Sequence, residues 1–454
     1  MEQLHAFIVM LDGYVWGPYV LLPLLVGTGI YLTLGLRCMP WLNIGRAAKH
    51  MWKGRRGEEG HEGEISPFKA MMTCMAATIG TGNIVGVATA IMIGGPGAVF
   101  WMWVTGFLGM STKYCEAVLA VKYREVTPAG DFVGGPMYYI KNGLGNSWKW
   151  MAFLFAVFGM VASFGIGNMT QANSIAANMA STFDIPEYAI AIMLLVVTGV
   201  VILGGVKRIG DVAGWLVPVM AVFYVIMGIT IMIINFDKVI PAFLSIFQNA
   251  FTPASATGGF IGASVLLAMR MGLARGLFSN EAGLGSGPIA HATAITNNPV
   301  RQGFLGMIDP FIDTIIVCSM TAIVILISGD WSTADRGSAA VMTSTAFGHA
   351  LPGLGQYGVS IGLLLFAFTT ILGWCVYGER CAVYLFGHRA LTPFRIVFTA
   401  VVPVGALLEL SFVWDLSDLF NGLMALPNLV ALLLLSPVVF KLTREFFGNP
   451  DNKL

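Results

Sequence analysis

Apolar runs long enough to cross a lipid bilayer recur along most of this chain. A helix that spans the hydrocarbon core needs about 20 mainly apolar residues, because it must satisfy its own backbone polar groups. Of the 454 residues, 56% are hydrophobic and only 11% are charged, which excludes an ordinary soluble globular protein. The short alternating strands of a porin-like barrel are not evident. The sequence therefore predicts an all-α polytopic membrane protein.

We predict eleven transmembrane helices in a single domain covering residues 1–454. Their approximate limits are 14–36, 67–93, 98–122, 148–183, 188–203, 212–234, 259–290, 303–328, 357–385, 394–410 and 416–440. The segments that we expect to be external include 235–258 and the loop that contains Arg336.

The placement of basic residues predicts the orientation. The loop after the first span is the most basic in the chain; it carries Arg37, Arg46, Lys49, Lys53, Arg55, Arg56 and Lys69. The positive-inside rule places this loop in the cytoplasm. Of the 25 Lys and Arg residues, only Lys238 and Arg336 fall in loops predicted to be external. An odd number of spans then puts the N-terminus outside and the C-terminus inside the plasma membrane.

Two predicted spans are interrupted by polar, glycine-dense stretches. The first reads Ala-Thr-Ile-Gly-Thr-Gly-Asn-Ile-Val-Gly at 77–86, and the second covers 278–288. Glycine lowers helix stability and lets the backbone turn, although packing glycines are also frequent in membrane helices. An unwound turn frees N–H groups that suit a carboxylate and carbonyls that suit a cation.

These interruptions occupy matching positions once residues 14–66, an extra first helix and its basic loop, are set apart. The other ten spans divide into halves of five, 67–235 and 259–440, and each half begins with its broken span. Because five is odd, the halves have opposite orientations in the membrane. Paired interruptions in two inverted halves indicate the midplane binding site of a secondary transporter.

Six stretches of the sequence resemble the alanine or glycine:cation symporter family, also called the sodium:alanine symporter family. They are Gly-Thr-Gly-Asn-Ile-Val-Gly-Val-Ala at 80–88, Gly-Gly-Pro-Gly-Ala-Val-Phe-Trp-Met-Trp at 94–103, Gly-Gly-Pro-Met-Tyr at 134–138, Gly-Ile-Gly-Asn-Met at 165–169, Phe-Ser-Asn-Glu-Ala-Gly at 278–283 and Gly-Trp at 373–374. Gly106 and Gly287 depart from the family pattern, where alanine or a similar residue is expected, and Gly287 bears on the packing of the seventh span.

The resemblance implies a leucine-transporter-type fold, with five-plus-five inverted repeats and two broken helices preceded by one extra helix. It also implies sodium-coupled, occasionally proton-coupled, uptake of alanine or glycine by alternating access. The expected partners are the amino acid, Na+ (or H+) and the lipid bilayer. No organic cofactor and no nucleic-acid partner is expected.

A zwitterionic substrate needs an anion site and a cation site. We assign its carboxylate to the N–H groups of Thr81 and Gly82 and to the side-chain amide of Asn83. Its ammonium group is assigned to freed carbonyls near Ala77–Thr78 and near Phe278, in the two interruptions.

The resemblance adds further substrate-binding residues. It implies that Gln171 faces the substrate, although such an amide equally serves helix–helix hydrogen bonding. Phe278 and Trp374 are expected to wall a small pocket, with ordinary packing as the alternative, and Gly283 belongs to the second interruption.

Sodium is expected to bind oxygen ligands, as hard cations do. Thr369 and Thr370 in the ninth span match the position where this fold class pairs hydroxyl groups with carbonyls of the first broken helix. Those carbonyls belong to Ala76 and Ile79. The alternative is that both threonines bond back to their own helix.

Several charged residues lie at membrane depth and are functional candidates. They are Lys113, Glu116, Arg270, Arg275, Glu281, Asp309, Asp313 and Glu379. Lys113 and Glu116 lie three residues apart on one helical face and are expected to pair. Glu281 is expected to hold unwound backbone or to respond to ion binding.

Other functions remain open at this point. Serine or glutamine could replace alanine or glycine as the substrate, and a channel could also use a broken helix. A more remote alternative is an intramembrane serine hydrolase that uses Ser286 with His291; these lie in one segment without a strained nucleophile turn. A dinucleotide site at the first glycine run is disfavoured because no strand precedes it.

Overall fold

The computed structural model describes residues 2–17, 19–55, 61–252, 265–329, 331, 339–408 and 411–449. Over these residues the chain is mostly helical, and its sheet is one antiparallel hairpin of β1 (Glu125–Val126) and β2 (Phe132–Val133). The predicted helical architecture is therefore confirmed. The predicted start of the seventh span at 259, and also Arg56 and Arg336, lie outside the described residues.

Six helices in the described ranges are long and apolar enough to cross a membrane. They are Asn146–Phe183, Gly205–Ile234, Pro299–Ser328, Gly355–Phe386, His388–Leu407 and Asp415–Gly448. A seventh span results if the bent pair Pro67–Thr78 and Gly82–Gly94 is counted as one. Leu21–Gly35 and Glu187–Ile202 are apolar but shorter, so eleven spans and a five-plus-five repeat remain predictions.

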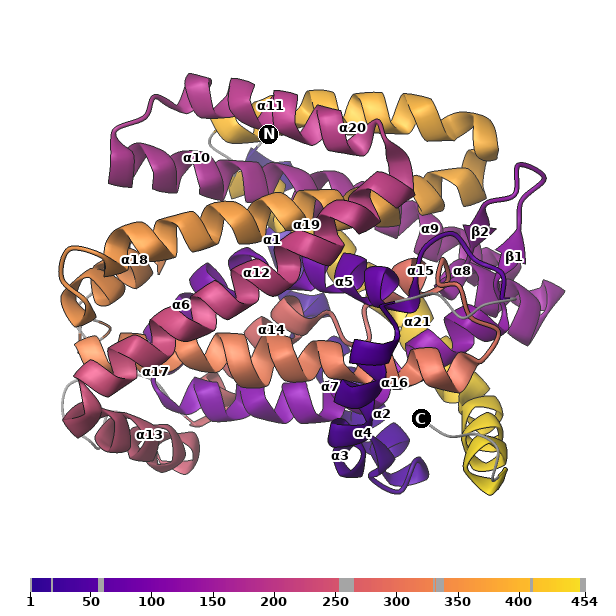
Figure 1. Ribbon diagram of the computed structural model, residues 1–454, viewed down its shortest axis with the longest axis horizontal. Helices are drawn as coiled ribbons and strands as arrows, with labels where there is room; N and C mark the ends of the chain where they lie inside the picture. Colours follow the sequence, from indigo (N-terminus) through magenta and orange to yellow (C-terminus); the bar gives the residue numbers. More distant parts are fainter. Residues whose placement is uncertain are drawn as a thin grey trace.

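The elements are named in chain order (Figure 1). The first half contains α1 (Glu2–Val15), α2 (Leu21–Gly35), α3 (Met39–Leu42), α4 (Ile44–Lys53), α5 (Pro67–Thr78), η1 (Gly82–Gly86), α6 (Val87–Gly94), α7 (Gly97–Lys122), α8 (Pro136–Tyr139), η2 (Ile140–Leu144), η3 (Asn146–Trp148), α9 (Lys149–Phe164), η4 (Gly165–Met169), α10 (Thr170–Phe183), α11 (Glu187–Ile202) and α12 (Gly205–Ile234). The second half contains α13 (Phe236–Phe251), α14 (Val265–Asn280), α15 (Gly287–His291), α16 (Pro299–Pro310), η6 (Phe311–Cys318), α17 (Ser319–Ser328), α18 (Ala339–Ala350), α19 (Gly355–Phe386), η8 (His388–Ala390), α20 (Leu391–Leu407) and α21 (Ser411–Gly448).

The long helices form a bundle whose two ends differ. In Figure 1 the helices run across the picture; α13 and α18 lie at the left end, and the β1–β2 hairpin lies at the right end. The helix α13 falls in the segment 235–258, for which no helix is predicted from the sequence. Its aromatic side chains pack on α7: the ring of Phe247 lies 5.8 Å from that of Phe100. Burial of an apolar face therefore stabilises a helix in a segment too short and too polar to read as a span.

The first broken helix begins and breaks where its residues dictate. The Ser66 hydroxyl accepts from the Lys69 N–H at 3.3 Å, and Pro67 takes the first helical position, both typical of a helix start. The α5 helix ends at Thr78, Ile79 is extended, and a π-helical turn, η1, follows. The two halves are bent by 49°, which confirms the predicted interruption.

The second broken helix is also interrupted where the sequence predicts. The α14 helix ends at Asn280, and α15 begins only at Gly287. Between them Gly283 and Gly285 have φ values of +91° and +84°, and Glu281 has a φ of +54°. Glycine adopts this left-handed backbone without strain, whereas other residues adopt it rarely.

Candidate functional site

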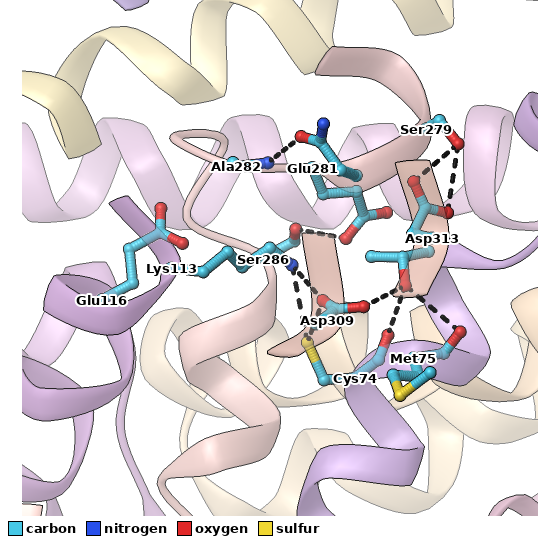
Figure 2. Close-up of polar contacts among 12 residues, drawn as sticks. Cys74, Met75, Lys113, Glu116, Ser279, Glu281, Ala282, Ser286, Asp309 and Asp313 are labelled. Atoms are coloured by element: carbon cyan, nitrogen blue, oxygen red, sulfur yellow. Dashed lines mark hydrogen bonds and ion pairs between the residues drawn. The ribbon is translucent and has the colours of Figure 1, made fainter. Parts of the chain in front are cut away.

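The two interruptions lie against each other. A Cβ atom at Gly82 would lie 3.1 Å from the Ser279 Cα and 3.3 Å from the Phe278 ring, so glycine permits this close approach. Asp313 in η6 joins both breaks: its carboxylate accepts from the Asn83 Nδ2 at 2.6 Å and from the Ser279 hydroxyl at 2.9 Å. Figure 2 shows Ser279 pointing at this carboxylate. The carboxylate of one span therefore fixes the relative position of two unwound turns.

Asn83 has a different environment from the other residues assigned to the substrate carboxylate. Its Oδ1 accepts from the Gly80 N–H at 2.8 Å, and its Nδ2 donates to Asp313. The side chain is fully buried and lies outside the lining of the central cavity. In this conformation Asn83 stabilises the first turn, and both the oxygen and the nitrogen of its side-chain amide are already hydrogen-bonded.

A small cavity of about 10 Å³, roughly the room that one water molecule needs, lies between the two breaks; we call it the central cavity. Its lining residues come from five helical spans and are Ala77, Thr78, Gly80, Thr81, Gly82, Ile166, Gln171, Phe278, Glu281, Thr370, Trp374 and Asn421. Six of the predicted substrate residues are therefore brought together here: Thr78, Thr81, Gly82, Gln171, Phe278 and Trp374. Gly283 and Asn83 are not in this lining.

Several polar atoms of the lining residues are buried without a partner. The hydroxyl of Thr81 and both polar atoms of the Asn421 amide make no hydrogen bond. Thr81 and Asn421 are each 1% exposed. Because leaving a buried polar group unpaired costs about 1–3 kcal/mol, such atoms are typical of a place where a polar ligand supplies the partners. The carboxylate of Glu281 also lies in this wall and accepts from the Ser286 hydroxyl at 2.6 Å.

The apolar wall of the cavity depends on the irregular helix η4. Its Gly167 is in contact with Trp374, since a Cβ there would lie 2.2 Å from the Trp374 Cβ. The Gln171 side chain donates to the Ile166 carbonyl at 2.9 Å and accepts weakly from the Thr81 N–H at 3.4 Å. Gln171 thus satisfies a backbone group of η4 while facing the first break. Such π-helical turns are frequent at functional sites.

The predicted sodium ligands are only partly brought together. The Thr370 hydroxyl lies 3.4 Å from the Ile79 carbonyl oxygen, and it also donates to the Phe366 carbonyl at 3.0 Å. The Thr369 hydroxyl donates to the Phe366 carbonyl at 2.9 Å and lies 3.5 Å from the Met220 sulfur of α12. Ala76 is fully buried in the last turn of α5. Thr370 and Ile79 therefore place two oxygen atoms side by side, while Thr369 faces α12.

A buried ion pair lies beside the first break. The Lys113 Nζ lies 2.8 Å from the Asp309 Oδ2, and both side chains are 0% exposed. The Asp309 Oδ1 accepts from the Thr78 hydroxyl at 2.8 Å, and the Cys74 thiol donates to Oδ2 at 3.3 Å (Figure 2). A Cβ at Gly287 would lie 2.9 Å from the Lys113 Nζ, so the glycine that departs from the family pattern leaves room for this lysine.

The expected pairing of Lys113 with Glu116 is wrong. The Glu116 carboxylate accepts from the Asn428 Nδ2 at 2.7 Å and from the Gly283 N–H at 3.2 Å, and Asn428 also binds the Gly283 carbonyl. Spacing on one helix does not reveal partners on other helices, and here Asp309 is the closer carboxylate. Gly283 therefore anchors the second break to α7 and α21, away from the central cavity.

Two arginines link separate segments of the chain at the hairpin end of the bundle. The Arg124 guanidinium donates to the carbonyls of Ala294 and Thr296 at 2.7 and 2.8 Å. Arg380 in α19 pairs with Glu64, which precedes α5, at 2.8 Å. Burial raises the pKa of Glu64 above its ordinary value of 4.5, and the charge of Arg380 opposes this rise.

The geometry excludes the serine hydrolase. The Ser286 hydroxyl donates to Glu281 at 2.6 Å, and the His291 Nδ1 contacts the Gln302 amide at 2.7 Å. The two side chains therefore serve separate partners and form no nucleophile–base pair.

The predicted site omitted Asn421, Ile166 and also Gly80 of the first interruption, and Glu281 was named without being placed in the cavity. An amide at membrane depth in the last span was a usable signal for Asn421, because such residues are rare in membrane helices. Ile166 carried no signal, since only the π-helical turn η4 aims it at the breaks.

Sequence comparison places this geometry in a known family. Residues 1–453 match the sodium:alanine symporter family. The chain is 48% identical to an uncharacterised transporter of Haemophilus influenzae over 446 residues, covering 98% of this chain and 96% of that protein. It is 47% identical to the sodium/alanine symporter AgcS of Methanococcus maripaludis, covering 96% and 95%. The probable sodium/glutamine symporter GlnT of Bacillus subtilis is 36% identical, covering 98% and 92%.

Solved structures support the fold. The crystal structure of MhsT in complex with L-phenylalanine aligns with a TM-score of 0.57 at 13% identity, covering 84% of this chain and 98% of MhsT. A manganese transporter of Eremococcus coleocola aligns with a TM-score of 0.51 at 12% identity, covering 85% and 88%. At such low identity these structures bear on the fold alone. The match over the whole sequence shows that this chain is a multi-pass membrane transporter, not an enzyme, and belongs to the sodium:alanine symporter family.

Proposed function

We propose that this protein imports a small neutral amino acid, alanine or glycine, together with Na+ by alternating access, and that the substrate binds in the central cavity. The observation that carries the proposal is the set of unpartnered polar atoms of Thr81 and Asn421 between two broken helices. The sodium/alanine symporter AgcS, at 47% identity, supports alanine. The similarity to GlnT keeps glutamine as an alternative, and serine is a further one.

Within the cavity, the substrate carboxylate binds the start of the second half-helix at Thr81 and Gly82. Free N–H groups at a helix start favour an anion. The ammonium group binds carbonyls near Thr78 and near Phe278, and the Glu281 carboxylate supplies the opposite charge. The role of Asn83 in this proposal is indirect, because its amide shapes the turn that presents those N–H groups.

The wall of the central cavity favours an amino acid with a small side chain. Trp374, Phe278 and Ile166 leave a space of only about 10 Å³ in this conformation, so a substrate must push its walls apart. Trp374 cannot retreat towards η4, because it already contacts Gly167. A longer side chain would have to displace one of these rings.

For sodium, we propose the Thr370 hydroxyl and the carbonyls of Ile79 and Ala76 as ligands, with Thr369 joining after a change of rotamer. Oxygen ligands of this kind suit a hard cation. Sodium would then brace the unwound turn that holds the substrate, which couples the two sites. By linkage, the amino acid must tighten sodium binding by the same factor.

The proposed topology has eleven spans, repeats at 67–235 and 259–440, an external N-terminus and a cytoplasmic C-terminus. Impermeant thiol labelling tests it in a background without Cys38, since the other five cysteines are buried. A cysteine at Ala129 in the hairpin turn should react only from the cytoplasm, and one at Asp237 in α13 only from outside. Reversed labelling would overturn the orientation.

Transport by purified protein in proteoliposomes tests the function. An inward Na+ gradient should drive accumulation of labelled alanine above its external concentration, and unlabelled glycine should compete. Accumulation driven equally by a proton gradient without Na+ would contradict sodium coupling, and non-saturable equilibration would indicate a channel. Glutamine competing better than glycine would replace the substrate assignment.

Variants then test the cavity. Asn421→Ala should weaken alanine binding roughly tenfold to hundredfold, the effect of losing a hydrogen bond to a charged group. Asn178→Ala is the matched control, because Asn178 is also a buried amide but binds the Ser344 hydroxyl away from the cavity. If Asn421→Ala and Asn178→Ala bound alanine with the same affinity, the substrate would have to bind elsewhere.

A further inference from the structure

A second cavity of about 110 Å³ adjoins the central cavity. Its wall is made by α1, α14 and α21, and its key residues are Asp12, Trp16, Arg270, Arg275, Phe278 and Asp418. Phe278 also lines the central cavity. One aromatic ring therefore lies between the two spaces.

The second cavity holds opposite charges apart. The Arg275 Nε and one carboxylate oxygen each of Asp12 and Asp418 are buried without a hydrogen-bond partner. In the described chain, neither Arg270 nor Arg275 comes within 4.0 Å of either carboxylate. Two positive and two negative side chains thus face one space without closing into pairs.

Other opposite charges in this protein do close. Lys113 and Asp309 approach to 2.8 Å, and Glu379 and Arg395 approach to 2.6 Å. A structural ion pair gains most of its energy at such short distances. Separated charges with unpaired atoms instead match a ligand that carries both charges itself.

We propose that the second cavity binds the amino-acid substrate as a zwitterion before it reaches the central cavity. The carboxylate of the amino acid pairs with Arg275, which presents a planar set of donors. Its ammonium group pairs with Asp12 and Asp418. The site rests on the proposed function, because its ligand is the transported amino acid.

The position of the second cavity fits an access route. The Arg275 guanidinium lies 5.6 Å from the centre of the Phe278 ring, so a carboxylate that binds Arg275 also meets the ring that separates the cavities. At the hairpin end of the bundle, Arg124 holds separate segments together by donating to four backbone carbonyls. Movement of Phe278 would connect the two cavities without opening that end.

Equilibrium binding of labelled alanine to the full chain in nanodiscs with saturating Na+ tests the proposal. The wild-type protein should bind about two alanines per chain, and Arg275→Gln should weaken the second site roughly tenfold to hundredfold while leaving the central site in place. Asp415→Asn is the matched control. Asp415 lies three residues before Asp418 on α21 but pairs with His5 at 2.6 Å, so this variant should still bind two.

Each outcome decides the question. A wild-type protein that binds one alanine in a sodium-dependent manner would overturn the second site and leave the proposed function standing. The second site would also be overturned if both Arg275→Gln and Asp418→Asn still bound two alanines. Absence of any sodium-dependent alanine binding by the wild-type protein would overturn both proposals. If Arg275→Gln does not fold, the wild-type stoichiometry and Asp418→Asn still decide.

Discussion

Replacing Lys113 with methionine should destabilise the protein strongly. The lysine nitrogen lies 2.8 Å from Asp309, and both side chains are 0% exposed. Removal of one partner from a buried ion pair costs about 3–5 kcal/mol, because the remaining charge stays buried and unpaired. Thr78 and Cys74 still donate to Asp309, so we expect a loss of about 3 kcal/mol, at the low end of that range.

A double-mutant cycle isolates the pair. Asp309→Asn keeps an oxygen that can accept from Thr78 but strands the charge of Lys113, so it should cost about 3–5 kcal/mol as well. Lys113→Met with Asp309→Asn removes both charges and should recover most of the loss. For residues in contact, the effect of a double mutation on the free energy of unfolding differs from the sum of the two single effects by about 0.5–3 kcal/mol.

The assay measures the midpoint of thermal unfolding in detergent, and unfolding is monitored as the loss of monodisperse protein. The control is Lys69→Met, because Lys69 pairs with Asp211 on the surface with both side chains more than 40% exposed. Such a pair contributes about 0–1 kcal/mol. If the double variant is as unstable as the two single losses added together, the charges do not depend on each other and the reasoning fails.

Three further predictions follow from the site. Thr370→Val should raise the Na+ concentration needed for alanine binding, and excess Na+ should restore affinity; an unchanged Na+ dependence would place the ion elsewhere. Gly167→Ala should abolish alanine binding without loss of the folded protein, since the new methyl group would overlap Trp374; normal binding would show that Trp374 can move. Burial raises the pKa of the Glu64 carboxyl above 4.5, so the stability that Glu64 contributes is complete below pH 4.5 and is lost as the pH rises through the raised pKa. Glu64→Gln should remove this pH dependence of the unfolding midpoint and leave Arg380 as the remaining charge. An unchanged pH profile would contradict the prediction.

The sequence alone determined the membrane class, the two broken helices and the residues at the first break. These features depend on local chemistry: apolar length sets the spans, and glycine with neighbouring polar residues interrupts them. For the same reason Thr81, Gly82 and Phe278 could be assigned to one site from their positions in the two interruptions. Family resemblance supplied Gln171 and Trp374, which periodicity alone would have left in the packing.

Tertiary structure decided the partners. Asn83 was predicted from the sequence to bind the substrate, but its side-chain amide is hydrogen-bonded to Gly80 and Asp313. Lys113 pairs across helices with Asp309 and not along its own helix with Glu116. Asn421, more than three hundred residues from the first break, lines the same cavity. Helix packing sets these relations, because it brings together side chains whose separation along the chain carries no information about distance.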